Sequence, residues 1–473
     1  MTLHGSFLSQ ARFGEPGIPV PRFAVIGRGF SGLMMAIALL RVVRRPFDLQ
    51  LFDPNPNVSG GQALASLQIG EILNSRVRDL SVADGDPDDF NRWLLDNAEF
   101  RSAVSAAIPG FHQIFVPKSI FSDYAYRRFS EALASRRDVT VRICTDVVQT
   151  VDRMPDGRYH IATCDGEPAL YDTVVLATGY GTDHAAAPAE PVAEGTVRAR
   201  RLVDCPHALL LGSGIRVVDR LFQLRDSGFA GRITILTAHG FLPQSHTRLA
   251  ADPVELAAPL PANLRDIVRH LRQACQQAEA SGQDWQSVMN AFRKQARSLW
   301  RSLPARQKRQ FNRHLRAIYD SHRNRLPEPH YLRLQRELAI GNTTIRKGRA
   351  GRVTGKGVMV RWRDTASDEF LAADPVIDCR CAAPDLAAPL LANLLQAGLA
   401  VPDELGLGLL VNATGQLMVD GKSTDDLYAV GPLGLGSLPD IDLVPEIVSQ
   451  AYAAAERIAD RCLDVGLGVG KTC

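Results

Sequence analysis

Short apolar runs that end at glycines recur along the chain, and a stretch of helical length follows several of them. The first run, Phe23–Ile26, leads into a glycine cluster and an apolar stretch at 33–43, and another short run follows at 49–52. A strand, a turn, a helix and a second strand within about 30 residues predict a β-α-β unit. We therefore expect a parallel sheet near the start of the chain.

The rest of the first half alternates helical and strand patterns. Helical periodicity is found at 90–95 and 122–134, and β-branched residues dominate 139–143, 147–151 and 159–162. The closeness of the last three runs predicts hairpin strands. A buried strand is predicted at 173–177, and the Ala/Pro-rich stretch 184–195 after it predicts a linker between domains.

A second strand-turn-helix pattern follows this linker. It begins with the apolar run 208–211 and continues as a helix at 217–227 and a strand at 233–236. From 261 to about 338 the periodicity is helical and the surface is strongly basic. Strand patterns return at 343–345, 357–362 and 375–379, and the chain closes with a strand at 427–430 and a helix from about 445 to 459.

Composition removes several classes of protein. The 54 Lys and Arg nearly balance the 51 Asp and Glu, and a net charge of +3 gives no field that would attract nucleic acid. The 8 cysteines include no CxxC pair and no zinc-binding spacing, which argues against a dithiol reductase and a metal site. We see no secretory signal and no apolar segment of roughly 18 residues, so we expect a cytoplasmic protein that does not bind membranes.

The glycine cluster after the first strand has the spacing G-x-G-x-x-G. In this position the first glycine permits a tight turn, the second lets a pyrophosphate approach the backbone, and the third lets the helix pack on the strand. Asp53, at the end of the next strand, is placed to bind a ribose diol, as FAD or NAD requires. The motif assigns these residues to dinucleotide binding: Gly27, Gly29, Phe30, Ser31 and Gly32.

The second strand-turn-helix pattern has a weaker version of the motif. Gly212 and Gly214 are present, but Val217 replaces the third glycine. No carboxylate follows the strand at 233–236, whereas Arg216 can meet a phosphate. We therefore assign Gly212, Gly214 and Arg216 to a nicotinamide coenzyme, and we favour NADPH over NADH.

Two more strand ends are candidates for contact with a flavin. Thr178 and Gly179 end the strand at 173–177, and Gly431 and Pro432 follow the strand at 427–430. Pro445 begins a helix whose amino terminus can stabilise negative charge on a reduced flavin.

A basic segment at 313–325 holds four arginines and two histidines. His314, His322 and Arg323 are our candidates for binding an anionic substrate and for acid-base catalysis. A solvated basic helix face explains the same pattern equally well.

Several segments together resemble a known family. They include Ile72-Leu73-Asn74, which adds Asn74 to the cofactor-binding candidates. In chain order the matching segments are 28–32, 72–74, 86–90, 92–94, 115–117, 123–124, 177–179, 313–316, 322–323, 405–408, 431–433 and 444–447. They resemble the bacterial FAD/NAD(P)-binding proteins grouped with the FAD-dependent urate hydroxylases and, more distantly, N-hydroxylating and Baeyer–Villiger flavin monooxygenases.

The resemblance implies an α/β fold with two Rossmann-like dinucleotide-binding domains, the second inserted in the first. We expect an FAD-binding domain at 19–190 and 365–473 and an NAD(P)H-binding domain at 196–364, with a helical insertion at about 261–338. The implied enzyme is a monooxygenase that uses NADPH or NADH, FAD and molecular oxygen, and that hydroxylates a small nitrogen-rich metabolite through a flavin hydroperoxide.

Urate is the named candidate substrate. The alternatives are an N-hydroxylase of an amine or amino acid in a biosynthetic pathway and a flavin-binding protein without turnover. A homodimer is one candidate assembly.

Overall fold

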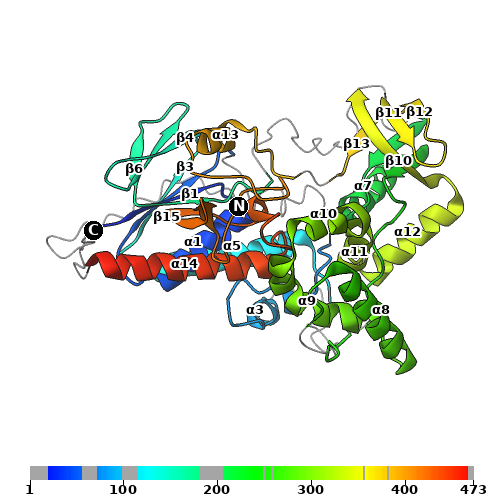
Figure 1. Ribbon diagram of the computed structural model, residues 1–473, viewed down its shortest axis with the longest axis horizontal. Helices are drawn as coiled ribbons and strands as arrows, with labels where there is room; N and C mark the ends of the chain where they lie inside the picture. The colour runs from blue at the N-terminus through cyan, green and yellow to red at the C-terminus, as the bar shows by residue number, and fades with distance from the viewer. Residues whose placement is uncertain are drawn as a thin grey trace. The chain divides into compact units, whose positions relative to one another are not determined.

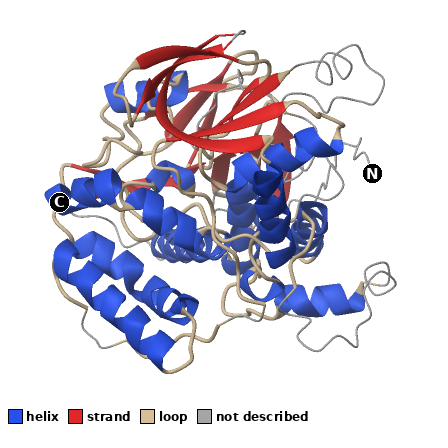
Figure 2. Cartoon of the chain, turned by 90° about the vertical axis from the view of Figure 1, so that its right-hand side faces the viewer, coloured by secondary structure: helices blue, strands red, loops and turns tan. Residues whose placement is uncertain are grey.

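The computed structural model describes residues 20–55, 72–97, 114–180, 206–248, 251–256, 260–354, 357–380 and 383–466. The chain divides into two compact units (Figure 1). Unit 1 comprises Met1–His184 and Ala383–Cys473, and unit 2 comprises Ala185–Ala382. Each unit combines helices with a six-stranded sheet, so the expected α/β class is confirmed (Figure 2). The predicted linker at 184–195 lies outside the described residues.

The sheet of unit 1 has the strand order β14-β15-β7-β1-β2-β3. Its strands are β1 (Arg22–Ile26), β2 (Asp48–Phe52), β3 (Thr140–Cys144), β7 (Thr173–Leu176), β14 (Gln416–Val419) and β15 (Lys422–Ala429). All neighbours pair in parallel except β14 and β15. The prediction that 139–143 forms a hairpin strand is wrong, because β3 pairs in parallel with β2, after a helical crossover.

Helices cover one face of this sheet. They are α1 (Phe30–Val42), α3 (Asp89–Asp96), α5 (Lys118–Ala134) and α14 (Val444–Gly466), joined by the short 3-10 helices Val77–Asp79 and Pro432–Gly434. Every residue of α1 from Phe30 to Leu40 is buried, because α1 packs against α5 and α14 as well as beneath the sheet. A helix that is apolar on all sides requires such a site.

The opposite face is covered by a smaller antiparallel sheet and one helix. These elements are β4 (Val148–Arg153), β5 (Tyr159–Thr163), β6 (Ala169–Tyr171) and α13 (Pro389–Gln396). Their apolar side chains join those of β1 and β7 in a second core, which includes Ile26, Val151, Leu176 and Leu391. Both faces of the main sheet are therefore covered by apolar packing.

Unit 2 has a sheet of order β12-β11-β10-β9-β8-β13. Its strands are β8 (His207–Leu211), β9 (Arg232–Thr237), β10 (Thr343–Thr354), β11 (Gly357–Trp362), β12 (Asp368–Ala372) and β13 (Val376–Asp378). The pairs of β8, β9, β10 and β13 are parallel, and β11 and β12 extend the sheet in antiparallel fashion. Because β13 still pairs with β8, unit 2 extends beyond the expected end at 364.

The helical part of unit 2 has its own apolar core. Its helices are α8 (Leu264–Ala280), α9 (Trp285–Ser302), α10 (Ala305–His314) and α11 (Arg316–Arg323), followed by α12 (Glu328–Ile340). Asn263 and Asp284 cap α8 and α9 through their side chains, which fixes where these helices begin. No helix in the described part of the chain has the length and apolar character needed to cross a membrane.

Arg225, at the end of α7 (Ile215–Asp226), ties the sheet and helices of unit 2 together. Its guanidinium donates to Glu337 on α12 at 2.9 Å, to the carbonyl oxygens of Phe229 and Gly231, and to Thr343 on β10. The side chains of Arg225 and Glu337 are only 13% and 19% exposed. Loss of this cation would leave a nearly buried carboxylate and two carbonyl groups without their donor.

We predict that Arg225→Met lowers the free energy of unfolding of unit 2 by about 3 kcal/mol, because it breaks a mostly buried, hydrogen-bonded ion pair. Urea denaturation followed by tryptophan fluorescence measures this, since Trp285, Trp300 and Trp362 all lie in unit 2. The control is Asp226→Asn, which removes an exposed ion pair with Arg333 between the same helices and should cost less than about 1 kcal/mol. Equal effects of the two changes would contradict the prediction.

Candidate functional site

The glycine loop after β1 requires glycine for steric reasons. Gly27 has φ +101°, and its N–H donates to the carbonyl oxygen of Phe52 at 2.8 Å. A Cβ at Gly27 would lie 2.4 Å from the carbonyl oxygen of Ala177, and one at Gly32 would lie 1.9 Å from that of Gly27. The loop thus brings β1, β2 and the end of β7 together in a way that no larger residue permits.

The amino terminus of α1 is open to an anion. Gly29 is the residue before the helix, with extended backbone and no capping side chain, and no acidic residue lies in the first turn. Phe30 and Ser31, the first residues of α1, are buried. Free N–H groups and the helix dipole at such a terminus favour phosphate.

Asp53 holds the loop as well as the end of β2. Its carboxylate accepts a hydrogen bond from the N–H of Arg28 at 2.8 Å and another from the N–H of Asn55 at 3.0 Å. Each carboxylate oxygen has a second lone pair, so Asp53 can also accept hydrogen bonds from a ribose diol. One side chain therefore orders the phosphate loop and offers a ribose contact.

Thr178 supplies an unsatisfied buried polar group at the end of β7. Its Oγ1 is inaccessible to solvent and has no hydrogen-bond partner among the described residues. The next residue, Gly179, has φ +67° and open space where a side chain would be. Buried hydroxyl groups are nearly always hydrogen-bonded, so this one indicates a position where a ligand supplies the partner.

The end of β15 approaches the glycine loop. Gly431 has φ +82°, and a Cβ there would lie 2.2 Å from Oγ of Ser31. The N–H of Gly431 donates at 2.8 Å to Oε1 of Gln450, a side chain of α14 that is 1% exposed. The structure thus brings Gly27, Ser31, Thr178 and Gly431 to one edge of the sheet, where the ends of β1, β7 and β15 meet.

The remaining candidates of unit 1 lie in neighbouring segments. Pro432 opens the 3-10 helix after β15, and Pro445 lies in the first turn of α14. Asn74 is half-buried and follows an isolated bridge between Ile72 and Pro117. Their contact with a cofactor stays a prediction. Sequence reasoning missed Gln450, because a glutamine within a helix gives no sign that its side chain accepts a hydrogen bond from the distant N–H of Gly431.

Unit 2 repeats the turn with differences. Gly212 has φ +132°, and its N–H donates to the carbonyl oxygen of Leu236 at 3.0 Å, as Gly27 does to Phe52. Gly214 precedes α7 as Gly29 precedes α1, and Arg216 is exposed in the first turn of α7. The equivalent hydrogen bonds make Thr237, after Leu236, the structural counterpart of Asp53.

The three predicted catalytic residues lie on the helices of unit 2. His314 is exposed at the end of α10. His322, on α11, donates from Nδ1 to the carbonyl oxygen of Ile318 at 2.8 Å, and its ring packs edge-on against Trp285. Arg323 points back to Asp320, with 3.8 Å between the charged atoms. A role for His314, His322 or Arg323 in catalysis stays a prediction.

The described cysteines form no disulfide, and two of them are strongly desolvated. Cys144, Cys164, Cys275, Cys379 and Cys462 are all free thiols. Burial raises the pKa of Cys379 to about 12 and that of Cys462 to about 11, so both remain protonated at neutral pH. Among the described residues, no group of three or more His, Cys, Asp or Glu side chains is placed to hold a metal ion.

Comparison with known proteins agrees with this architecture. The model of an FAD-NAD(P)-binding family matches residues 24–181, which hold the glycine loop, Asp53 and Thr178. No curated protein sequence matches the chain. The solved structures described next share the fold.

The ornithine N-hydroxylase KtzI of Kutzneria sp. 744 is 14% identical, with 94% of this chain and 100% of that chain covered and a TM-score of 0.61. The L-lysine 6-monooxygenase of Pseudomonas syringae is 16% identical, with 93% and 99% covered and a TM-score of 0.59. The bacillithiol disulfide reductase Bdr of Staphylococcus aureus is 12% identical, with 94% and 99% covered and a TM-score of 0.51.

We predict that Thr178→Val weakens FAD binding by roughly 5-fold while the FAD-free protein becomes no less stable, because the lost hydroxyl has no partner among the described residues and is worth about 1 kcal/mol only to a bound ligand. Fluorescence titration with FAD and thermal unfolding of the FAD-free protein measure the two effects. Thr234→Val is the control, since it removes a buried hydroxyl that is bonded to His207 at 2.9 Å and should lower stability. A destabilised FAD-free Thr178→Val protein with unchanged FAD affinity would contradict the prediction.

Proposed function

We propose that this protein is an FAD-dependent monooxygenase that consumes NADPH or NADH and hydroxylates the nitrogen of a small amine or amino-acid side chain. One observation carries the proposal: the chain, with both dinucleotide-type units and the helices of unit 2, follows the fold of an ornithine N-hydroxylase over 94% of its length. The two units would divide the work. Unit 1 would hold the flavin and unit 2 the nicotinamide coenzyme.

The residues of unit 1 fit FAD. The diphosphate would lie at the amino terminus of α1, where Gly29 leaves the N–H groups uncapped. The ribose diol would donate to Asp53, and the hydroxyl of Thr178 would gain a partner that the described residues do not supply. The steric limits at Gly27 and Gly431 keep these groups in one arrangement, so the site would be formed before the cofactor arrives.

Bound FAD would supply hydride acceptance from the coenzyme and activation of molecular oxygen. The protein would contribute position and charge. The amino terminus of α14, which begins at Val444, would stabilise negative charge in its vicinity. Exclusion of water from the reacting groups would keep the oxidant from being lost as hydrogen peroxide.

The substrate class follows from the fold comparison and from the basic helices. An amino acid offers a carboxylate as well as an amine, and His314, His322 and Arg323 are our candidates for holding that carboxylate. Urate hydroxylation, our first expectation from sequence, takes second place, because the monooxygenases with the same fold act on amines.

Disulfide reduction is a candidate only through the fold shared with the bacillithiol disulfide reductase. Two of the eight cysteines, Cys379 and Cys462, are held in the thiol form by burial. The sequence also contains no CxxC pair. We therefore favour oxygen over a disulfide as the electron acceptor.

The test uses the purified, FAD-loaded protein. We expect either NADPH or NADH to bleach the flavin absorbance without oxygen, which excludes a flavin-binding protein without turnover. In air, we expect one amine among ornithine, lysine, cadaverine and related compounds to give a product heavier by one oxygen atom that reacts as a hydroxylamine. Urate is included in the panel, and product mass spectrometry identifies where the oxygen is bound.

Two outcomes would overturn the proposal. In the first, coenzyme oxidation yields only hydrogen peroxide with every compound. In the second, the flavin transfers electrons to a low-molecular-weight disulfide faster than to oxygen.

A further inference from the structure

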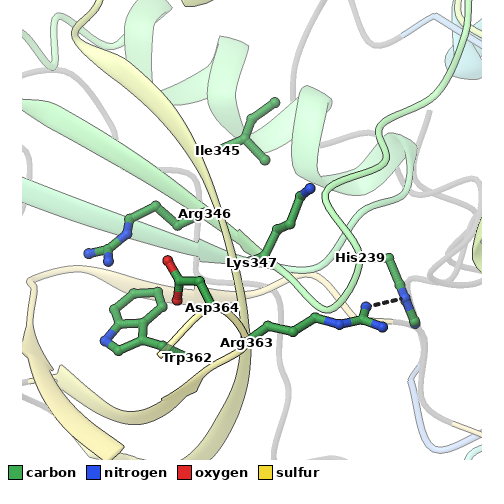
Figure 3. A pocket seen from close by; sticks show the side chains of 7 residues that line it. All are labelled: His239, Ile345, Arg346, Lys347, Trp362, Arg363 and Asp364. Carbon is green, nitrogen blue, oxygen red and sulfur yellow. Dashed lines mark hydrogen bonds between the residues drawn. The ribbon is translucent and has the colours of Figure 1, made fainter. Parts of the chain in front are cut away.

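A basic pocket of about 470 Å³ opens in unit 2 near the end of β9 and beside the first half of β10 (Figure 3). Side chains from three segments line it: His239 follows β9, Arg346 and Lys347 belong to β10, and Trp362, Arg363 and Asp364 lie at the end of β11. The segments meet because β10 pairs with β9 on one side and with β11 on the other. Lys347 and Arg363 extend to the side of His239, whereas Arg346 extends to the side of Trp362 and Asp364.

Hydrogen bonds to the turn after β9 hold the side chain of Arg363 in place. Its guanidinium donates to the carbonyl oxygen of Ala238 at 3.0 Å and to Nδ1 of His239 at 2.7 Å. A guanidinium only donates, so Nδ1 of His239 is an acceptor and the ring proton is on Nε2. Burial and the nearby Arg363 and Arg349 lower the pKa of His239, which agrees with a neutral ring. His239 can therefore donate from Nε2.

Lys347 reaches the same turn. Gly240 has φ +82°, which favours glycine, and a Cβ there would lie 2.5 Å from Cε of Lys347, so the lysine chain passes close to the turn. The hydroxyl of Thr237 accepts hydrogen bonds from the N–H groups of His239 and Gly240 and so holds the turn itself. The turn and a cation thus lie side by side.

The remaining charges of the pocket are partly engaged. The guanidinium of Arg346 stacks on the indole of Trp362 at 3.6 Å, which keeps it beside the pocket. The carboxylate of Asp364 accepts from the N–H of Thr365 at 2.9 Å, within its own turn. Lys347 and Arg363 are consequently the cations best placed to meet an anion.

The two units differ at the residue that selects between a ribose with a free 2′-hydroxyl and one with a 2′-phosphate. Asp53 follows β2 in unit 1, and its counterpart in unit 2 is Thr237, which has no charge. A carboxylate at this position binds a free 2′-hydroxyl and repels a 2′-phosphate. In unit 2 this carboxylate is replaced by the hydroxyl of Thr237. Two cations, Lys347 of β10 and Arg363 directly after β11, line the pocket beside it.

We propose that this pocket binds the 2′-phosphate of the adenosine ribose of NADPH, with Lys347 and Arg363 as its specificity-determining residues. The inference rests on the proposed function, in which unit 2 holds the nicotinamide coenzyme. It adds that the preference for NADPH comes from the β10–β11 pair, beyond the glycine loop and Arg216.

The test measures binding of nucleotide fragments to the FAD-loaded protein by calorimetry. We expect adenosine 2′,5′-bisphosphate to bind 10-fold to 100-fold more tightly than 5′-AMP, since its 2′-phosphate accepts charge-assisted hydrogen bonds that 5′-AMP cannot accept. Adenosine 3′,5′-bisphosphate should bind no more tightly than 5′-AMP. The double variant Lys347→Met/Arg363→Met should bind both bisphosphates like 5′-AMP, with its affinity for 5′-AMP unchanged.

Arg272→Met is the control, because it removes an exposed cation of α8 in the same unit that does not line the pocket, and it should keep the discrimination. Equal affinity of the unmodified protein for the 2′,5′-bisphosphate and 5′-AMP would overturn the inference, as would full discrimination in the double variant or equal binding of the two bisphosphates. If the double variant does not fold, the single variant Lys347→Gln, at an exposed side chain, repeats the test. Unchanged discrimination between the 2′,5′-bisphosphate and 5′-AMP in that variant would also contradict the inference.

These outcomes are separate from the fate of the proposed function. Reduction of the flavin by NADH as well as by NADPH, with hydroxylation intact, would leave that proposal standing while the pocket inference fails. Clear discrimination between the nucleotide fragments without any hydroxylation would support the pocket inference while the proposed function fails.

Discussion

The structure of unit 1 depends on one close approach of backbones. Gly27 lies against the carbonyl oxygen of Ala177 while its N–H is bonded to Phe52, so three strands converge on a single residue without a side chain. Ser31 and Gly431 then make a second contact of the same kind. Since each contact leaves no space for a Cβ, the edge of the sheet has one arrangement. The polar groups left over at that edge are those that a dinucleotide can satisfy.

The two units show how one plan serves two purposes. Each begins with a strand, a glycine turn and a helix, and the first glycine in each bonds to the end of the second strand. The difference lies in the next residue, Asp53 in one unit and Thr237 in the other. The carboxylate of Asp53 and the hydroxyl of Thr237 each accept hydrogen bonds from their own loop. Lys347 and Arg363 make the charge at this point of the sheet positive in unit 2, where it is negative in unit 1.

Sequence patterns predicted local units well and distant pairings poorly. The β1-α1-β2 unit and the helices of unit 2 were predicted because their apolar spacing is short-range and regular. The error at β3 arose because β-branched residues indicate a strand without indicating its partner. The basic pocket was missed for a similar reason: His239 and Arg363 are far apart in sequence and meet only through β10. Likewise, that the hydroxyl of Thr178 has no partner among the described residues becomes visible only when its surroundings are known.

The order in which the strands are added has a consequence for biosynthesis. The chain leaves unit 1 after β7 and returns only at Ala383, yet β15 pairs directly with β7. A growing chain must therefore complete all of unit 2 before the sheet of unit 1 can close, while unit 2 is continuous and is free to fold as soon as it emerges. Until then the inner edge of β7 stays unpaired, so a ribosome that stalls within unit 2 would release a chain prone to aggregate through that edge.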